Sequence, residues 1–454
     1  MPAFNNHPGG QPAVKRATLP SGKGEPRPLN GHCQLHVVRT EGELDALEER
    51  WNGLISCSDV SAFQTFEWMR TWWKYFGTNR RLHSLIVTEE GRTIGIAPMF
   101  LEDARILGLR VATRLRFMGC GISDYCDFII ARGKEEPVLH AFAHYLLAHS
   151  GEWDIFEVAD VNERAQLYKI LPRLLKERGM GVYTYQGNVC PSLALPGSWE
   201  GFLAGLGQKM RHHLKKKREM LNRQYRTEVE IFKSASDDID LAVNEFIQIH
   251  ERRWKSLGFR SAFDDEVHRE FHYEVARRMA RRGWLRLFFL KVDGRRVAVS
   301  FDFNFNKRIH VYLSHACGPE EIMKCSPGFL IRCIAIDRGI AEGMEIYDLL
   351  RGNEAYKYEE LKCVRSENWL VRGVGCSRKS RARFRIFLVG EFAIKCFDRI
   401  RREYHEFRRF AITKKPTTMA SLRFFQSKLI LLYKLGVNYC ERFFFNESQR
   451  HAPR

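Results

Sequence analysis

The clearest alternation of hydrophobic and polar positions runs through residues 285–316, in three short segments. Their sequences are LRLFFLKV, VAVSFDFNF and RIHVYLSHA, and the dipeptides Asp293-Gly294 and Asn306-Lys307 separate them. Segments rich in β-branched and aromatic residues, joined by two-residue turns of this kind, are typical of hairpins. The pattern therefore predicts a three-stranded antiparallel meander.

The meander is expected to have one apolar and one polar face, because successive side chains of a strand point to opposite sides. The apolar face collects Val297, Val299, Phe301, Phe303 and Phe305, with Ile309, Val311 and Leu313 available to match them. The polar face collects Ser300, Asp302, Asn304, His310, Tyr312 and Ser314. Such a face is either the solvated side of an antiparallel sheet or one wall of a substrate cleft, where a His or a carboxylate could act as a base.

Helical patterns surround the meander and complete a lobe over residues 196–376. Segments 199–225, 238–258 and 264–283 precede the strands, and CSPGFLIRCIAIDRGIAEGM follows them as a helix ended by Gly343. EIYDLL then predicts one more strand.

Residues 35–195 predict a first lobe of mixed type. FQTFEWMRTWWKYFG carries aromatic residues at helical spacing, and LHSLIVTEE with TIGIAPMFLE reads as a hairpin across Glu90-Gly91-Arg92. The expected fold class is therefore mixed α/β (α+β), with two lobes of mainly antiparallel sheets flanked by helices.

The two ends of the chain differ from these lobes. Residues 1–34 hold six prolines and five glycines, which predicts a disordered tail. Residues 377–454 predict a basic helical extension, because nineteen Lys and Arg face six Asp and Glu from residue 378 onward. This extension is either a pair of solvated helices or an anchor on anionic lipid.

Composition narrows the class of partner. The chain of 454 residues carries a formal net charge of +19, which favours anionic partners. Its twelve cysteines contain no C-x-x-C pair, and no metal is expected. The beginning of the sequence has no secretory signal pattern, and no window of 18 apolar residues occurs, so we expect a cytoplasmic protein.

Two segments have the chemistry of phosphate sites. Ser326, Pro327 and Gly328 precede a helix, whose first N–H groups can bind a phosphate, although Ser-Pro is also ordinary helix capping. Upstream, a predicted helix carries six cations, which either are simply solvated or contact phosphates of a cofactor, acceptor or nucleic acid. They are Lys209, Arg211, Lys215, Lys216, Lys217 and Arg218.

A set of segments in a fixed order carries a family resemblance. FQTFEWMRTWW, GIAPMF, FMGCGISDYCDFII, IHERRW, LRLFFLKVDGRRVAVSF, SPGFLI and YDLLRGNEAYKYE occur in this order over about residues 35–375. Together they resemble GNAT-superfamily acetyltransferases of the CelD/BioF-like type, relatives of the FemAB aminoacyltransferases. The resemblance implies tandem GNAT-like lobes, an acyl-CoA donor such as acetyl-CoA, an amine acceptor, and a role in bacterial cellulose or exopolysaccharide synthesis.

The resemblance also assigns residues. It places the donor along Tyr312, Leu313 and Ser314, with its pyrophosphate at Ser326, Pro327 and Gly328. It assigns substrate binding to Asp124, Tyr125, Asp127, Arg253, Trp254, Arg351 and Lys357. Without the resemblance, SDYCD is typical of an Asx turn and RGNEAYKYEE of a polar turn.

Acyl transfer from a thioester to an amine needs a base, hydrogen-bond donors for the carbonyl oxygen, and an acid for the leaving thiolate. Asp348, His310 or Glu354 could supply the base, a strand N–H the hydrogen-bond donor, and Tyr356 the acid.

The chain departs from ordinary acetyltransferases because the Q/R-x-x-G-x-G/A loop is absent and only Gly328 remains. Two alternatives therefore stay open. One is a FemAB-like aminoacyltransferase that uses aminoacyl-tRNA, and the other is a non-catalytic polysaccharide-assembly factor that keeps the fold.

Overall fold

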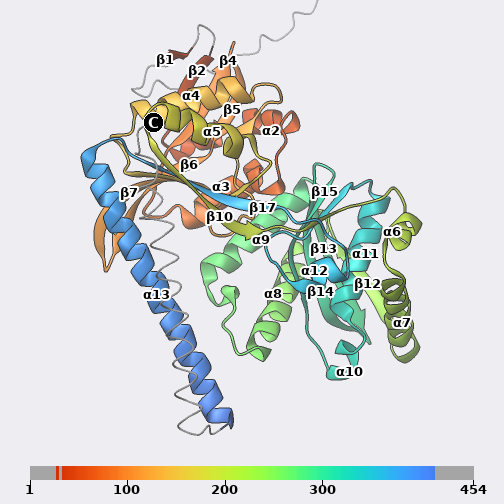
Figure 1. Cartoon of the computed structure of the whole chain (residues 1–454). Helices are drawn as coiled ribbons and strands as arrows, with labels where there is room; N and C mark the ends of the chain where they lie inside the picture. The colour runs from red at the N-terminus through yellow and green to blue at the C-terminus, as the bar shows by residue number, and fades with distance from the viewer. Residues whose placement is uncertain (1–26, 30–32, 415–454) are drawn as a thin grey trace, which may run out of the picture.

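The computed structural model describes residues 27–29 and 33–414 and contains three β-sheets (Figure 1). The N-terminal sheet has the order β1-β2-β4-β5-β8, the bridging sheet β10-β17-β9-β7-β6-β3, and the second-lobe sheet β11-β16-β15-β14-β13-β12. Helices pack against these sheets, so the mixed α/β (α+β) class expected from the sequence is confirmed.

The first lobe contains the N-terminal sheet, the bridging sheet and five helices. The N-terminal sheet consists of β1 Arg27–Leu29, β2 Cys33–Val38, β4 Ser84–Glu89, β5 Arg92–Ala97 and β8 Ile129–Ile130. The bridging sheet consists of β3 Arg81–Leu82, β6 Met99–Ile106, β7 Leu109–Phe117, β9 Ile155–Asn162, β10 Gly181–Val189 and β17 Glu367–Val374. The helices are α1 Glu41–Asp45, α2 Glu48–Ser56, α3 Phe66–Phe76, α4 Glu135–Ala148 and α5 Gln166–Glu177.

The second lobe contains one sheet with helices on both faces. Its strands are β11 Ser192–Ala194, β12 Thr227–Phe232, β13 Leu285–Val292, β14 Arg295–Phe305, β15 Arg308–Ala316 and β16 Ile346–Asp348. Its helices are α6 Trp199–Gly205, α7 Gln208–Gln224, α8 Ile239–Ser256, α9 Glu266–Arg281, α10 Glu320–Met323, α11 Pro327–Ala341 and α12 Ala355–Glu359. A single helix, α13 Arg378–Lys414, follows β17.

The predicted meander is confirmed as β13, β14 and β15, paired antiparallel. Asp293-Gly294 and Asn306-Lys307 all have positive φ, as a two-residue turn between twisted strands requires. The solvated alternative for the polar face is wrong for Ser300 and Asp302, which are both fully buried. The core on that side of the sheet includes residues of α11, so helices cover both faces of the sheet.

The predicted hairpin after residue 82 is only partly a single unit. β4 pairs with β5, but TIGIAPMFLE divides at Pro98, and its second half forms β6 in the bridging sheet. A proline has no N–H to donate to a sheet ladder, so it is suited to the point where the chain leaves one sheet for another.

Strands cross the predicted boundary between the lobes in both directions. β17 comes from the segment 196–376 and pairs with β9 and β10 of the first lobe, whereas β11 comes from 35–195 and pairs with β16. The predicted disordered tail lies outside the described residues except for residues 27–29 and 33–34. Residues 415–454, with the second apolar stretch of the predicted extension, also lie outside them.

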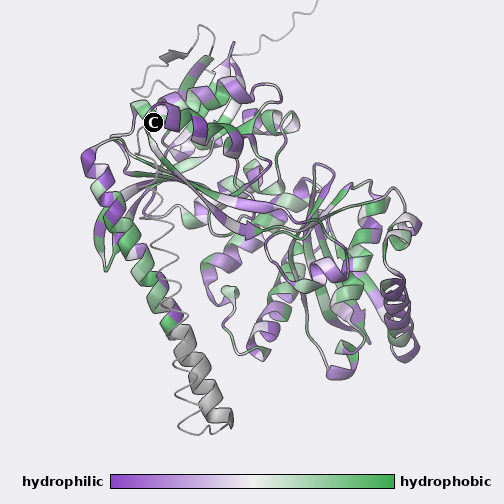
Figure 2. Cartoon of the chain, in the orientation of Figure 1, coloured by the Kyte–Doolittle hydropathy of each residue, from purple (hydrophilic) through white to green (hydrophobic). Residues whose placement is uncertain are grey.

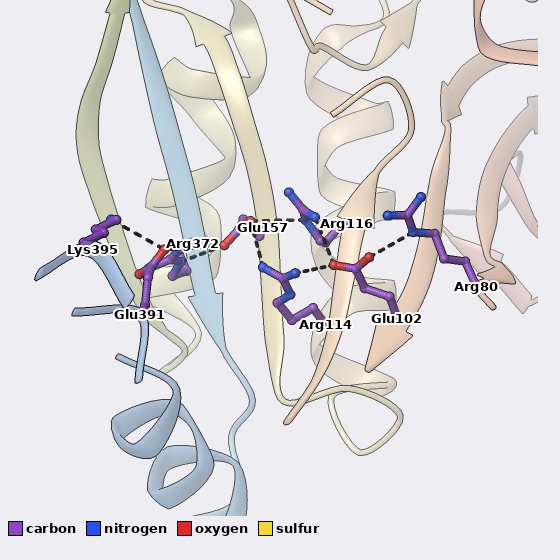
Figure 3. A network of polar contacts seen from close by, with 8 residues as sticks. All are labelled: Arg80, Glu102, Arg114, Arg116, Glu157, Arg372, Glu391 and Lys395. Carbon is purple, nitrogen blue, oxygen red and sulfur yellow. Dashed lines mark hydrogen bonds and ion pairs between the residues drawn. The ribbon is translucent and has the colours of Figure 1, made fainter. Parts of the chain in front are cut away.

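Buried ion pairs hold β17 and α13 in place (Figure 3). Arg372 on β17 donates to Glu157 on β9 at 2.7 Å, and both side chains are nearly inaccessible to solvent. Arg372 also pairs with Glu391 of α13 at 3.2 Å. Arg116 continues the network from Glu157 to Glu102 on β6, with distances of 3.2 and 2.9 Å. The network therefore joins four strands and the first part of α13.

Removing Arg372 should destabilise the fold strongly, because it leaves the Glu157 carboxylate buried with weaker compensation. We expect Arg372→Met to lower the free energy of unfolding by about 3–5 kcal/mol. The matched control is Arg173→Met, whose ion pair with Glu177 is exposed at both ends. That change should cost less than about 0.5 kcal/mol. Denaturant titrations of both variants check this, and equal losses would contradict it.

Glu157 should also make the free energy of unfolding depend on pH in the acidic range. Burial alone would raise its pKa, but Arg372, Arg116 and Arg114 outweigh burial and lower the pKa to about 2. Because the folded pKa lies below the unfolded one, this stabilisation is complete above the ordinary glutamate pKa and is lost as pH falls toward 2. Glu157→Gln should flatten the profile of unfolding free energy between about pH 5 and pH 2. An unchanged slope would exclude this role.

Candidate active site

Asp348, at the end of β16, lies where the two lobes meet. Its side chain is fully buried and accepts hydrogen bonds from the Tyr125 hydroxyl at 2.9 Å and from Arg308 at 2.8 Å. The Leu350 N–H donates to its other oxygen at 2.9 Å. Burial raises the pKa of Asp348, whereas Arg308 and the hydrogen bonds lower it, and the net pKa is above the usual aspartate value. Tyr125 comes from the first lobe, so the structure unites two sequence-predicted residues that are 223 positions apart.

A second inter-lobe pair lies beside the first. Arg351 forms an ion pair with Asp124 and lies 3.5 Å from a carboxylate oxygen of Asp160. Asn368, on β17, donates to the Asp124 carbonyl at 2.7 Å. Burial raises the pKa of Asp124 to about 6, although Arg351 opposes the shift. The exchanged strand β17 therefore holds the Asp124 segment against the loop that follows β16.

Lys357 shapes that loop. Its buried ammonium donates to the carbonyls of Leu349 and Arg351, each at 3.1 Å, and to that of Gly352 at 3.3 Å. It also pairs with Glu354 at 3.0 Å. Gly352 has a φ of +133°, a conformation that L side chains rarely adopt. Lys357 thus fixes the loop by pulling three carbonyls toward one charge, and protein groups occupy its donors.

The other predicted catalytic residues differ in accessibility. His310 is adjacent to Asp348 across the β15–β16 ladder and is fully buried, and burial lowers its pKa to about 3, so it is neutral at pH 7. Glu354 is 55% exposed beside Lys357. The Tyr356 ring lies under the Arg332 guanidinium, 4.5 Å from its centre, and burial raises the Tyr356 pKa.

The strand pairing beside Asp348 is short. β15 and β16 are parallel partners only from Arg308 to His310, whereas β15 continues to Ala316. The register of β14 with β15 shifts so that Leu313 faces Phe301 and Val311 faces Asp302, which makes Tyr312 an extra residue. Among the described strands, none pairs with β15 on its β16 side beyond His310. The predicted donor residues Tyr312, Leu313 and Ser314 lie on this stretch.

The other end of this stretch leads to the start of α11. A Cβ built on Gly328 would lie 3.4 Å from the Ala316 Cβ, so the predicted phosphate loop abuts the end of β15. Ser326 has a φ of +55°, and its carbonyl already accepts from the N–H groups of Phe329 and Leu330. Pro327 has no N–H. The predicted phosphate loop therefore lies against the end of β15. However, two N–H groups near the start of α11 are already hydrogen-bonded to the Ser326 carbonyl.

The basic helix α7 lies beside this start. The His213 ring is 5.5 Å from the ring of Phe329, and Lys217 donates to the Lys324 carbonyl. Arg211 instead caps the end of α6 by donating to the Leu206 carbonyl at 2.6 Å. Figure 2 shows α7 as the most hydrophilic helix on its side of the second lobe. Part of the predicted cation set therefore borders the predicted phosphate loop.

Arg253 and Trp254 lie at the end of α8, away from the Asp348 hydrogen bonds. They adjoin two imidazoles that the sequence analysis did not select, the buried His250 and the half-buried His315, whose ring centres are 4.6 Å apart. Asp127 is in the first lobe and accepts from the Phe128 N–H at 2.7 Å, and burial raises its pKa to about 7.

Arg308 is the site residue that the sequence analysis missed most clearly. Both strands were predicted, but the β15–β16 register that brings Arg308 near Asp348 was not. The available signal was an arginine at the start of the strand that carries His310.

The described residues contain no cluster of three or more His, Cys, Asp or Glu side chains that could hold a metal. No helix in the part of the chain that the structure describes is long and apolar enough to cross a membrane.

Residues 208–358 match the family model of the acetyltransferase (GNAT) domain. The chain contains a GNAT acetyltransferase-like domain. This domain covers the second lobe from α7 to α12, and with it the separation of β15 from β16. A comparison with curated protein sequences finds no match.

A solved structure, FemX, shares the fold over most of this chain, and two further structures are similar at lower TM-scores. FemX superposes with a TM-score of 0.53 at 10% identity, over 71% of this chain and 95% of that chain. A tandem GNAT protein from the clavulanic acid biosynthesis pathway has a TM-score of 0.42 at 11% identity, over 76% and 99% of the two chains. The C-terminal domain of a putative lysylphosphatidylglycerol synthetase from Agrobacterium fabrum has a TM-score of 0.46 at 12% identity, over 76% and 95%. The family model over residues 208–358 supports the GNAT part of the resemblance, FemX supports the fold alone, and the CelD-like type is a proposal.

Removing Arg351 should loosen the junction between the lobes, because Asp124 then stays buried without its cation. We expect Arg351→Met to lower the free energy of unfolding by about 2–4 kcal/mol. The control is Arg365→Met. Arg365 lies 3.1 Å from Glu367, but the Arg365 side chain is half exposed. This change should cost under about 1 kcal/mol. Thermal unfolding with calorimetry checks both, and a loss in the control as large as in Arg351→Met would contradict the assignment.

Proposed function

We propose that this protein is an N-acyltransferase that binds an acyl donor in its second lobe and an amine acceptor at the junction of the lobes. The observation that carries the proposal is the stretch of β15 from Val311 to Ala316, which has no described strand beside it on the β16 side. This stretch begins next to Asp348 and ends against Gly328. A donor lying along it would have its reactive end near Asp348 and its phosphates near α11 and α7.

The proposed roles follow from the position of each group. Asp348 accepts the proton of the acceptor ammonium, and its burial favours this because it strengthens the carboxylate as a base. The freed amine attacks the carbonyl carbon, and a β15 backbone N–H stabilises the oxygen. As the bond between the carbonyl carbon and the thioester sulfur breaks, Tyr356 gives its proton to the departing thiolate, and its phenolate takes the remaining excess proton from the new amide nitrogen. Tyr125 and Arg308 position Asp348, and Glu354 and His310 are the alternative bases.

The donor is proposed to be an acyl-CoA, as GNAT domains generally use. The positive charge of α7 and the alignment of Gly328 with β15 support this choice. Aminoacyl-tRNA is the second candidate, because Pro327 and the engaged N–H groups of Phe329 and Leu330 leave little of the usual pyrophosphate loop. A cytoplasmic location is proposed from the sequence pattern, and an acceptor from cellulose or exopolysaccharide synthesis is proposed from the sequence resemblance.

Asp348→Asn should lower kcat/KM by about 100-fold or more, because general base catalysis contributes at least that factor. The acid limb of the wild-type pH profile should lie above the ordinary aspartate range, because burial raises the pKa of Asp348, and rates should fall as pH drops through it. The Asp348→Asn variant should lose this limb.

Tyr356→Phe should mainly slow the reaction of donors with poor leaving groups. Turnover of acetyl-CoA with an amine panel, followed as released thiol, provides the measurement.

A control variant and a donor-binding measurement complete the test. Glu345→Gln changes an exposed carboxylate that forms an ion pair with Lys307, and it should keep full activity. Mass spectrometry and thermal shift of the purified protein identify the donor, since a ligand stabilises the state that binds it. Bound tRNA with no response to CoA would replace the acyl-CoA donor by aminoacyl-tRNA, and no response to either would favour a non-catalytic assembly factor.

A further inference from the structure

The first part of α13 has two apolar faces, only one of which is covered. Phe384, Phe387 and Leu388 pack into a small core with β7, β9 and β17, and Arg383 pairs with Asp154 at 3.1 Å. A second set at spacings of three to five residues stays exposed and forms a stripe along the helix. It consists of Ile386, Val389, Ile394, Phe397 and Ile400, and Phe397 is 66% exposed.

The tip of the β6–β7 hairpin extends the same surface. Leu107 is 98% exposed and Leu109 is 73% exposed. Leu107 also has a φ of +51°, a conformation that favours glycine or asparagine over leucine. A Cβ built on Gly390 would come 1.9 Å from Ile106, so α13 crosses the hairpin next to its tip (Figure 1). We name the stripe and the two tip leucines the apolar ridge.

The sequence of α13 is rich in cations. Residues 378–414 contain twelve Lys and Arg against four Asp and Glu, a net charge of +8, and Arg105 and Arg110 flank the hairpin tip. Exposed apolar groups with a surplus of cations are the signature of a helix that lies in the interface of an anionic membrane.

We propose that the apolar ridge binds the surface of an anionic lipid bilayer, with Leu107, Leu109 and Phe397 inserted among the acyl chains. Charge decides against the other occupants. A second copy of this chain would bring another +8 against the first, and residues 415–454 carry seven Lys and Arg against two Asp and Glu. A nucleic acid would match the charge but not the exposed leucines, which gain by leaving water for hydrocarbon. This surface is separate from the proposed active site.

The test is flotation of the full chain with vesicles of phosphatidylglycerol and phosphatidylcholine, compared with pure phosphatidylcholine. We expect binding to the anionic vesicles that weakens with salt. The double variant Leu107→Asn, Phe397→Gln should bind roughly tenfold or more weakly, because two buried side chains are lost. Asn tolerates the left-handed conformation at position 107, so this change should not impair folding.

The matched control is Leu241→Gln with Val267→Gln, which removes two exposed apolar side chains from α8 and α9 of the second lobe. It should bind vesicles as the unchanged protein does. Absence of binding at low salt overturns the proposal. So does a double variant that binds as tightly as the control, which would mean charge alone suffices. A dimer in solution that dissociates in the double variant, without any vesicle binding, assigns the ridge to a second copy and also overturns it.

Discussion

Glu157 and Arg372 form a buried ion pair between adjacent strands of the bridging sheet, and the arrangement of the two lobes depends on it. Arg372 lies on β17, which leaves the second lobe and enters the sheet of the first. Two charges with so little access to water are stable only if they form an ion pair with each other. The pair therefore favours the one β17–β9 register that places Arg372 beside Glu157. Arg372 also forms an ion pair with Glu391, and this contact helps to fix the direction of α13 relative to the bridging sheet.

The position of β17 has a direct consequence for the candidate active site. The strand follows the loop that contains Arg351 and Lys357, and its residue Asn368 holds the Asp124 segment. Tyr125 is thereby brought to Asp348, so a residue of each lobe contributes to one hydrogen-bonded group. Removal from water then changes the proton affinity of these groups: the pKa values of Asp348 and Asp124 rise, while that of His310 falls. Burial at the lobe junction therefore shifts the pKa values of the groups to which we assign catalysis in the proposed function.

The surface around α13 follows a different physical rule. A leucine at the tip of a hairpin does not stabilise a protein in water. At Leu107, both the exposure of the side chain and the positive φ of the backbone are unfavourable. Apolar groups in such a place are explained by a partner that removes them from water. The surplus of arginine and lysine in the sequence of α13 is the reason that we propose an anionic partner for this surface.

Local pattern alone determined much of the second lobe. The meander of β13, β14 and β15 was predictable because alternation and turn residues act over a few positions, and the helix 327–341 was predictable from its period and its terminal glycine. The candidate residues Asp348, Tyr125, Asp124 and Arg351 came from a resemblance spread over both lobes. Their mutual contacts, and the contribution of Arg308, required the tertiary structure, because a strand register and an exchanged strand are set by packing between segments far apart in the chain. For the same reason, the sequence could not show that Ser300 and Asp302 are buried: alternation places them on one face, but only the docking of α11 decides what covers that face.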